Sequence, residues 1–100
     1  MDPNRTEKRI NIEIPPELEA AYANMAVITH TASEVVIDFA RVLPNAARNR
    51  VYARVVMTPM NAKALLRALT TNLDKYEAQF GEIRTADDKG EERTIGFRHD

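Results

Sequence analysis

One group of residues has the types and spacing of a metal or catalytic site. His30, Glu34 and Asp38 occupy even-numbered positions in strand-like sequence, and a histidine with two carboxylates suits a divalent metal. A polar break at 31–33 separates His30 from Glu34, so we expect His30 to end a strand beside a turn. Ser33 is the only serine, and neither a G-x-S-x-G motif nor a glycine-rich phosphate loop is present. The sequence therefore predicts no catalytic residue, no metal and no cofactor.

The second group is a basic segment, residues 39–73, which contains no acidic side chain, whereas residues 1–38 carry three basic and seven acidic ones. Arginines around an aromatic ring can hold nucleic-acid phosphates and stack a base. This gives a tentative binding set: Arg41, Arg48, Arg50, Tyr52 and Arg54. The alternative, which we favour, is that these arginines form ion pairs with acidic residues within or between subunits. A net charge of −1 and an aromatic content of 6% argue against bulk attraction to nucleic acid.

The chain of 100 residues is long enough for one small domain, and its 44% hydrophobic and 29% charged residues are ordinary for a globular protein. There is no cysteine, which excludes disulfides and thiolate chemistry. No segment has the apolar run of a signal peptide or a membrane span, so we predict a cytoplasmic protein that does not bind membranes. We place the domain at 9–83, between a flexible N-terminus at 1–8 and a charged, disordered tail at 84–100.

Four segments have the pattern of β-strands. In the first, Ile10, Ile12 and Ile14 alternate with polar residues, and Pro15–Pro16 ends the alternation. The other three are rich in β-branched residues and cover 20–30, 34–43 and 50–57. The short breaks between the segments predict an antiparallel meander.

A helix is predicted to follow from about Pro59 to about Phe80. Thr58 is a good N-cap, Pro59 suits the first helical position, and Gly81 suits the residue after the last turn. Apolar residues recur at steps of three and four between these limits: Ala62, Leu66, Leu69, Leu73, Tyr76 and Phe80, with Leu65 beside them. The predicted fold class is therefore α+β, a four-stranded antiparallel meander followed by one long C-terminal helix packed on the sheet.

Both faces of the predicted sheet are apolar, although one helix can cover only one of them. Alternation places one set together: Met25, Val27, Val35, Ile37, Phe39, Val51, Ala53, Val55 and Met57. The opposite set contains the residues that we expect at an interface between copies: Tyr22, Ile28, Val36, Val42 and Val56. A second copy of the chain is the simplest second layer, so we predict a homodimer or a larger homo-oligomer.

Several stretches resemble the small bacterial family catalogued as domain of unknown function 3467. They lie between about residues 9 and 83 and include Tyr22–His30, Ser33–Glu34, Asp38–Phe39, Arg41–Pro44, Met57–Pro59, Ala62–Lys63, Leu65–Leu69 and the helix end at Asn72, Tyr76–Glu77 and Phe80–Gly81. The resemblance implies no activity, because the family has no established one. A meander followed by a long helix is also similar in outline to SecB-type export chaperones, an analogy at the level of fold.

These observations predict a non-enzymatic, oligomerising binding or adaptor module, for which a chaperone-like role is one form. The alternative function is single-stranded nucleic-acid binding by the Arg41–Arg54 surface. The expected partner is a second copy of the chain and, beyond that, another protein. Nucleic acid is the less favoured partner.

Overall fold

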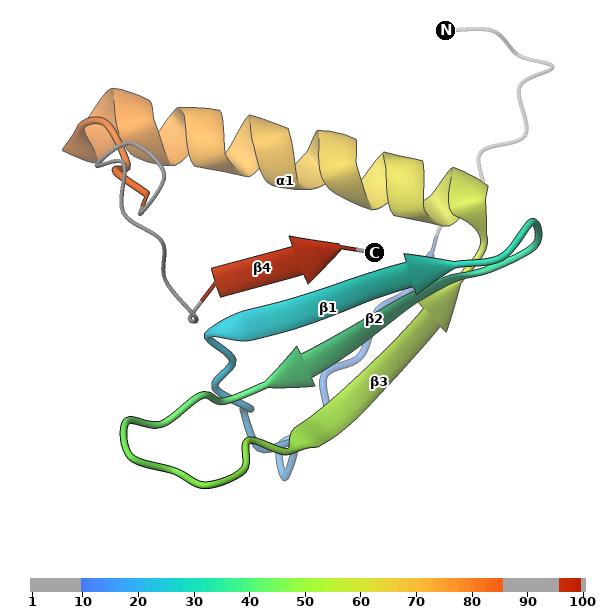
Figure 1. Cartoon of the computed structure of the whole chain (residues 1–100). Coiled ribbons are helices and arrows are strands. Elements are labelled where there is room, and N and C mark those ends of the chain that lie inside the picture. The colour runs from blue at the N-terminus through green and yellow to red at the C-terminus, as the bar shows by residue number, and fades with distance from the viewer. Residues whose placement is uncertain (1–9, 86–95, 100) are drawn as a thin grey trace, which may run out of the picture.

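The computed structural model describes residues 10–85 and 96–99, which form one sheet and one long helix (Figure 1). The elements, in chain order, are β1 (Met25–His30), β2 (Val35–Ala40), β3 (Val51–Met57), α1 (Pro59–Phe80) and β4 (Gly96–His99). The strands lie side by side in the order β3-β2-β1-β4. β1, β2 and β3 pair antiparallel, which confirms the α+β class, whereas β4 pairs parallel to β1.

The β1–β2 turn is formed by the polar break that the sequence indicated. The Thr31 hydroxyl accepts hydrogen bonds from the backbone N–H groups of Ser33 and Glu34, at 3.3 and 3.2 Å. The Thr31 N–H in turn donates to the Glu34 carbonyl at 2.9 Å. A threonine hydroxyl that bonds to nearby backbone stabilises a turn, and this one ends the ladder at the pair His30 and Val35.

At the other end of the hairpin, Asn24 extends the β1–β2 pairing beyond the strands. Its side-chain amide donates to the Val42 carbonyl at 3.0 Å, and its side-chain oxygen accepts from the Val42 N–H at 2.7 Å. The Asn24 N–H also donates to the Ala40 carbonyl at 3.2 Å. One side chain thus satisfies both backbone groups of Val42 where regular pairing has ended.

The helix matches the predicted limits, Pro59–Phe80, because both of its ends carry the expected caps. The Thr58 hydroxyl accepts from the Asn61 N–H at 3.1 Å, and Pro59 takes the first turn, where a backbone N–H is not needed. Gly81 has a φ of 101°, a conformation that side chains disfavour, and its N–H donates to the Glu77 carbonyl at 2.9 Å.

The first and last predicted segments differ from expectation. Residues 10–24 contain no strand, so the predicted strand at Ile10–Ile14 is wrong for this chain alone and the antiparallel part of the sheet has three strands. A strand needs a neighbour for its backbone groups, and none of the described strands pairs with 10–14. The fourth strand comes instead from Gly96–His99, inside the segment predicted as a disordered tail. The rest of that tail beyond residue 85 lies outside the described residues.

The faces of β1 are also reversed relative to the prediction. Ala26 pairs with Phe39 and Ile28 with Ile37, so Ala26 and Ile28 lie on the face that was expected to hold Met25 and Val27. The reason is the turn, because pairing His30 with Val35 brings even-numbered residues opposite odd-numbered ones. A shift of one residue moves every side chain of a strand to the other face.

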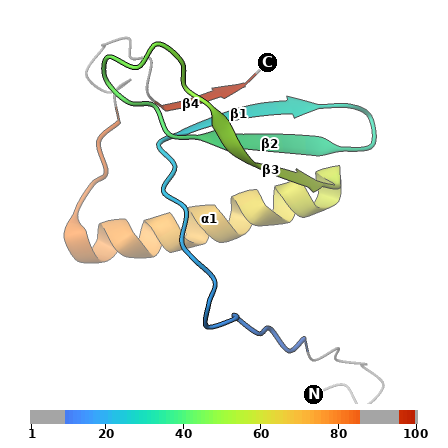
Figure 2. The ribbon, with the colours of Figure 1, turned by 90° about the horizontal axis from the view of Figure 1, so that it is seen from below.

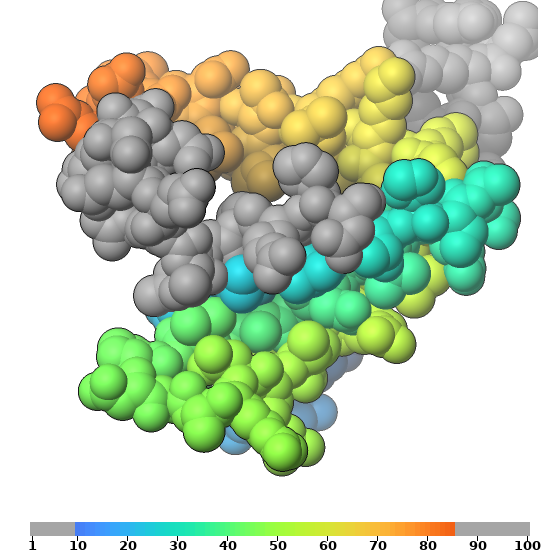
Figure 3. Space-filling model, viewed as in Figure 1, coloured from blue at the N-terminus to red at the C-terminus, as the bar shows by residue number. Residues whose placement is uncertain are grey.

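The buried core is small and lies in the sheet. Its apolar members are Ala26, Ile37 and Ala40, at 3, 8 and 6% exposure, and no residue of α1 is buried. In the space-filling view the helix forms a ridge along one side of the molecule, and the β2–β3 loop forms the opposite side (Figure 3). The predicted packing of the helix on the sheet is therefore incomplete in a single chain.

Candidate interaction surfaces

An apolar groove runs between the sheet and the first half of α1. We call it the helix groove, and about 280 Å³ of space lies between its walls. The sheet contributes Ala26, Ile28, Val35, Ile37 and Phe39, and α1 contributes Ala62, Leu65, Leu66 and Leu69. Leu66 and Leu69 remain 61 and 51% exposed although both line the groove. The groove can accept apolar side chains but offers no charged or titratable group.

The apolar stripe of α1 continues beyond the groove to the end of the helix. Leu73, Tyr76 and Phe80 are 42, 49 and 66% exposed. The rings of Tyr76 and Phe80 are in contact, with centroids 5.0 Å apart and planes tilted by 44°. The stripe was predicted from its spacing, and the structure shows that the described part of this chain leaves it uncovered.

The opposite face of the sheet carries part of the predicted oligomer interface. Val36 and Val56 are direct partners there, and Val56 is 51% exposed. Tyr22 and Val42 lie outside the strands, at the Asn24 end of the hairpin. Ile28 does not belong to this set, because it lines the helix groove on the other face. The structure therefore splits the predicted interface between two faces.

Three of the four predicted arginines and the tyrosine meet in one open hollow, which we call the arginine hollow. It is lined by Arg41, Arg48, Arg50 and Tyr52, together with Ala20, Ala21, Tyr22, Leu43 and Asn49. Tyr52 is held in place because its hydroxyl donates to the Tyr22 carbonyl. Within the part of the chain that the structure describes, Arg41, Arg48 and Arg50 form no ion pair. The hollow thus presents uncompensated positive charge beside an aromatic ring.

Arg54, the fourth predicted arginine, lies apart from the hollow and pairs with Asp38 directly across β2 and β3. Its Nε donates to Asp38 Oδ1 at 2.6 Å and its Nη2 to Oδ2 at 3.1 Å, a bidentate geometry. These hydrogen bonds hold the pKa of Asp38 below its usual range, against the opposing effect of desolvation. Arg54 thus forms an ion pair within the chain, with an acidic residue of the first 38.

The Asp38–Arg54 pair predicts a small acid-dependent loss of stability. Because folding lowers the pKa of Asp38, its contribution is complete above the unfolded-state pKa of about 3.9 and is lost as pH falls through the lower folded-state pKa. The unfolding free energies of the unchanged chain and of Asp38→Asn should therefore converge as pH falls below about 4. Urea unfolding between pH 3 and 7 measures this, and Arg54→Gln serves as the control that keeps the carboxyl. Parallel curves for the unchanged chain and Asp38→Asn would contradict the prediction.

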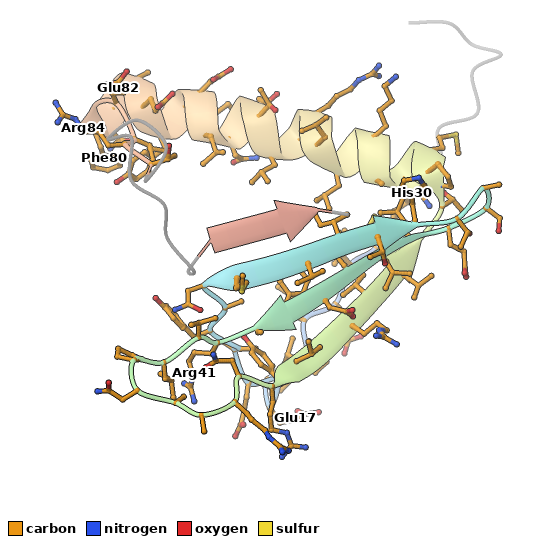
Figure 4. The ribbon with its side chains drawn as sticks, in the orientation of Figure 1. Glu17, His30, Arg41, Phe80, Glu82 and Arg84 are labelled. Atoms are coloured by element: carbon orange, nitrogen blue, oxygen red, sulfur yellow. The ribbon has the colours of Figure 1, made fainter. Side chains whose placement is uncertain are left out.

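The residues that suggested a metal or a catalytic site do not come together. His30 is paired with Val35 at the end of β1, so it lies on the face of Val35 and Ile37, whereas Asp38 lies on the other face and pairs with Arg54. Figure 4 shows His30 at the end of the sheet that is remote from Arg41. Among residues 10–85 and 96–99, no three His, Cys, Asp or Glu side chains form a group that could hold a metal ion. The sequence reasoning missed the helix groove, because it placed Ala26 and Ile28 of β1 on the other face of the sheet. The number of residues in the β1–β2 turn, which sets the register of β1, was the signal that could have revealed the groove.

Comparison with known proteins gives a family and nothing more specific. Within the described residues, no helix combines the length and the apolar content that a membrane crossing requires. No curated protein and no solved structure matches the chain, so the similarity in outline to SecB-type chaperones has no structural support. The sequence profile described as "Protein of unknown function (DUF3467)" matches residues 1–85. Since this match covers most of the 100 residues, the chain belongs to the DUF3467 family.

Proposed function

We propose that the chain is a non-enzymatic binding module that assembles as a homodimer through the helix groove and the apolar stripe of α1. The observation that carries the proposal is that α1 is apolar along one side yet has no buried residue. Helices of globular proteins bury such a stripe, because most of the stability of a helix comes from packing its apolar side against other elements. The described part of the chain has no element that covers this stripe. A second copy would cover it with its own apolar stripe.

The free energy available from covering the stripe supports a dimer. Its six large members, Leu65, Leu66, Leu69, Leu73, Tyr76 and Phe80, are each between 42 and 66% exposed. Full burial of such a side chain contributes about 1.5–3 kcal/mol, so burying the exposed parts contributes roughly 5–9 kcal/mol per chain. Both chains contribute in a two-fold dimer, which is enough to offset the several kcal/mol that association costs.

The proposal is tested by the mass and the thermal stability of the purified chain. Light scattering at micromolar concentration should give at least twice the 11.3 kDa of one chain. The melting temperature should also rise with protein concentration, since dissociation is coupled to unfolding. A folded monomer with a melting temperature independent of concentration would overturn the proposal.

A second candidate function, binding of single-stranded nucleic acid, is favoured by the arginine hollow. Arg41, Arg48 and Arg50 surround Tyr52 without ion-pair partners in the described chain, and phosphates could replace those partners. Affinity for a single strand should then fall with salt, at a logarithmic slope of about 0.7 per neutralised phosphate.

Two variants test this second function: one replaces the arginines of the hollow, and the other replaces the arginine outside it. Joint replacement of Arg41, Arg48 and Arg50 by Gln should abolish binding, whereas Arg54→Gln should preserve it because Arg54 is already engaged by Asp38. Absence of binding at physiological salt, or equal loss in both variants, would exclude the hollow as the site. Loss of the dimer in the triple variant would instead indicate that these arginines pair between subunits.

A further inference from the structure

The N-terminal segment 10–14 has the pattern of a strand, but no strand in the described part of the chain pairs with it. Ile10, Ile12 and Ile14 are 79, 82 and 75% exposed, and they are separated by the polar residues Asn11 and Glu13. In Figure 2 the segment runs away from the sheet, past the helix. An alternation of this kind is typical of a strand with one buried face, and a single described chain provides no such face for it.

Among the described residues, no strand pairs with the outer edge of β3, and from Ala53 to Met57, beyond the register shift opposite Phe39 and Ala40, its pairing with β2 is regular. β3 is the last strand of the sheet, and along its seven residues Val51, Val55 and Val56 are 49, 39 and 51% exposed. Edge strands normally carry charges, proline or a covering element that prevents pairing with other chains. The one charged side chain of β3, Arg54, is turned to Asp38 of the neighbouring strand.

We propose that residues 10–14 of one copy add as a strand to the outer edge of β3 in the other copy; this inference rests on the proposed dimer. The added strand would pair the free backbone groups of both segments. Its isoleucines would lie beside Ala53, Val55 and Met57, which share the face of the helix groove. Its Glu13 would then lie on the opposite face, beside the exposed side chain of Arg54, which already pairs with Asp38.

The path of the chain favours exchange between copies over pairing within one chain. The turn after Pro15, closed by a hydrogen bond from the Leu18 N–H to the Pro15 carbonyl at 3.0 Å, precedes the segment that lines the arginine hollow. The Tyr22 carbonyl is fixed by the Tyr52 hydroxyl at the start of β3. With position 22 anchored, residues 10–14 extend away from their own sheet and leave their own β3 edge free (Figure 2).

The test uses the full chain, which has no cysteine of its own. Ile12→Cys is combined in turn with Ala53→Cys, Val55→Cys and Met57→Cys, so that three registers are sampled. Neighbouring strands bring directly opposed residues within the distance that a disulfide spans. After mild oxidation we expect one of these double variants to give a covalent dimer, with peptide mapping that joins residue 12 to β3.

Controls separate this inference from the dimer itself. Asn11→Cys with Val55→Cys should fail to cross-link, because residue 11 lies on the other side of the added strand, and Val55→Cys alone should also fail. In the unchanged chain, the amides of 10–14 should exchange hydrogen slowly at dimer concentrations. Three results would overturn strand exchange but leave the dimer intact, provided that light scattering shows a dimer. They are a cross-link within one chain, cross-linking of Val55→Cys alone, and fast hydrogen exchange at 10–14. A folded monomer would overturn the dimer and with it this inference.

Discussion

Leu69→Ala is expected to lower the unfolding free energy of the assembled protein by about 2–5 kcal/mol and to weaken the dimer. Leu69 lines the helix groove, yet 51% of its surface is exposed in a single chain. In the proposed dimer the second copy covers that half, so truncation leaves a cavity at the interface as well as in the groove. Urea unfolding at two protein concentrations, with light scattering on the same samples, measures both effects.

Arg67→Ala is the matched control, because residue 67 lies about 160° around the helix from Leu69. It is exposed, and its loss should change the unfolding free energy by no more than about 0.5 kcal/mol. A change below about 1 kcal/mol for Leu69→Ala, with the mass unaltered, would mean that the stripe faces solvent and that the dimer forms elsewhere.

Ile37→Ala should also be strongly destabilising, by about 2–5 kcal/mol, for a reason internal to the chain. Ile37 is only 8% exposed, lies on the central antiparallel strand, and contacts neighbours on both sides through its pairs Ile28 and Val55. A small domain has about 5–15 kcal/mol in total, so much of the sample should unfold. Circular dichroism at a fixed concentration reports this.

Ile37→Val is the conservative comparison, with an expected cost of about 0.5–1.5 kcal/mol. Similar costs for the two variants would show that the buried position is not tightly packed. A cost below about 1 kcal/mol for Ile37→Ala would show that the sheet is not where the stability of this chain resides.

The helix α1 and the β1–β2 turn could be predicted from the sequence because the residues that specify them act locally. Thr58, Pro59 and Gly81 act within a few residues of themselves, and the structure confirms the helix at Pro59–Phe80. The break at Thr31 likewise acts through hydrogen bonds from the backbone N–H groups of Ser33 and Glu34 to the Thr31 hydroxyl. Such features form whatever the rest of the molecule does.

The segments that depend on distant partners could not be predicted in the same way. The alternation at Ile10–Ile14 signals a strand, but only the presence of a neighbour decides whether one forms. The face of β1 depends on the number of residues in one turn, so a miscount of one moved Ile28 from the groove to the predicted interface. For the arginines, spacing alone did not distinguish Arg54, paired to Asp38, from the three that meet in the hollow.

A single residue, Thr58, joins the edge strand β3 to α1. The backbone conformation of this joint sets the direction of the whole helix. Pro59 fixes its own φ and restricts Thr58 to the extended region, where Thr58 is found with φ −71° and ψ 157°. The 22-residue helix is about 33 Å long, so a rotation of about 5° at the joint displaces Phe80 by about 3 Å. The direction of α1 is therefore set by backbone geometry at its base. A partner meets a stripe that is already aligned, and little ordering entropy is lost when it binds.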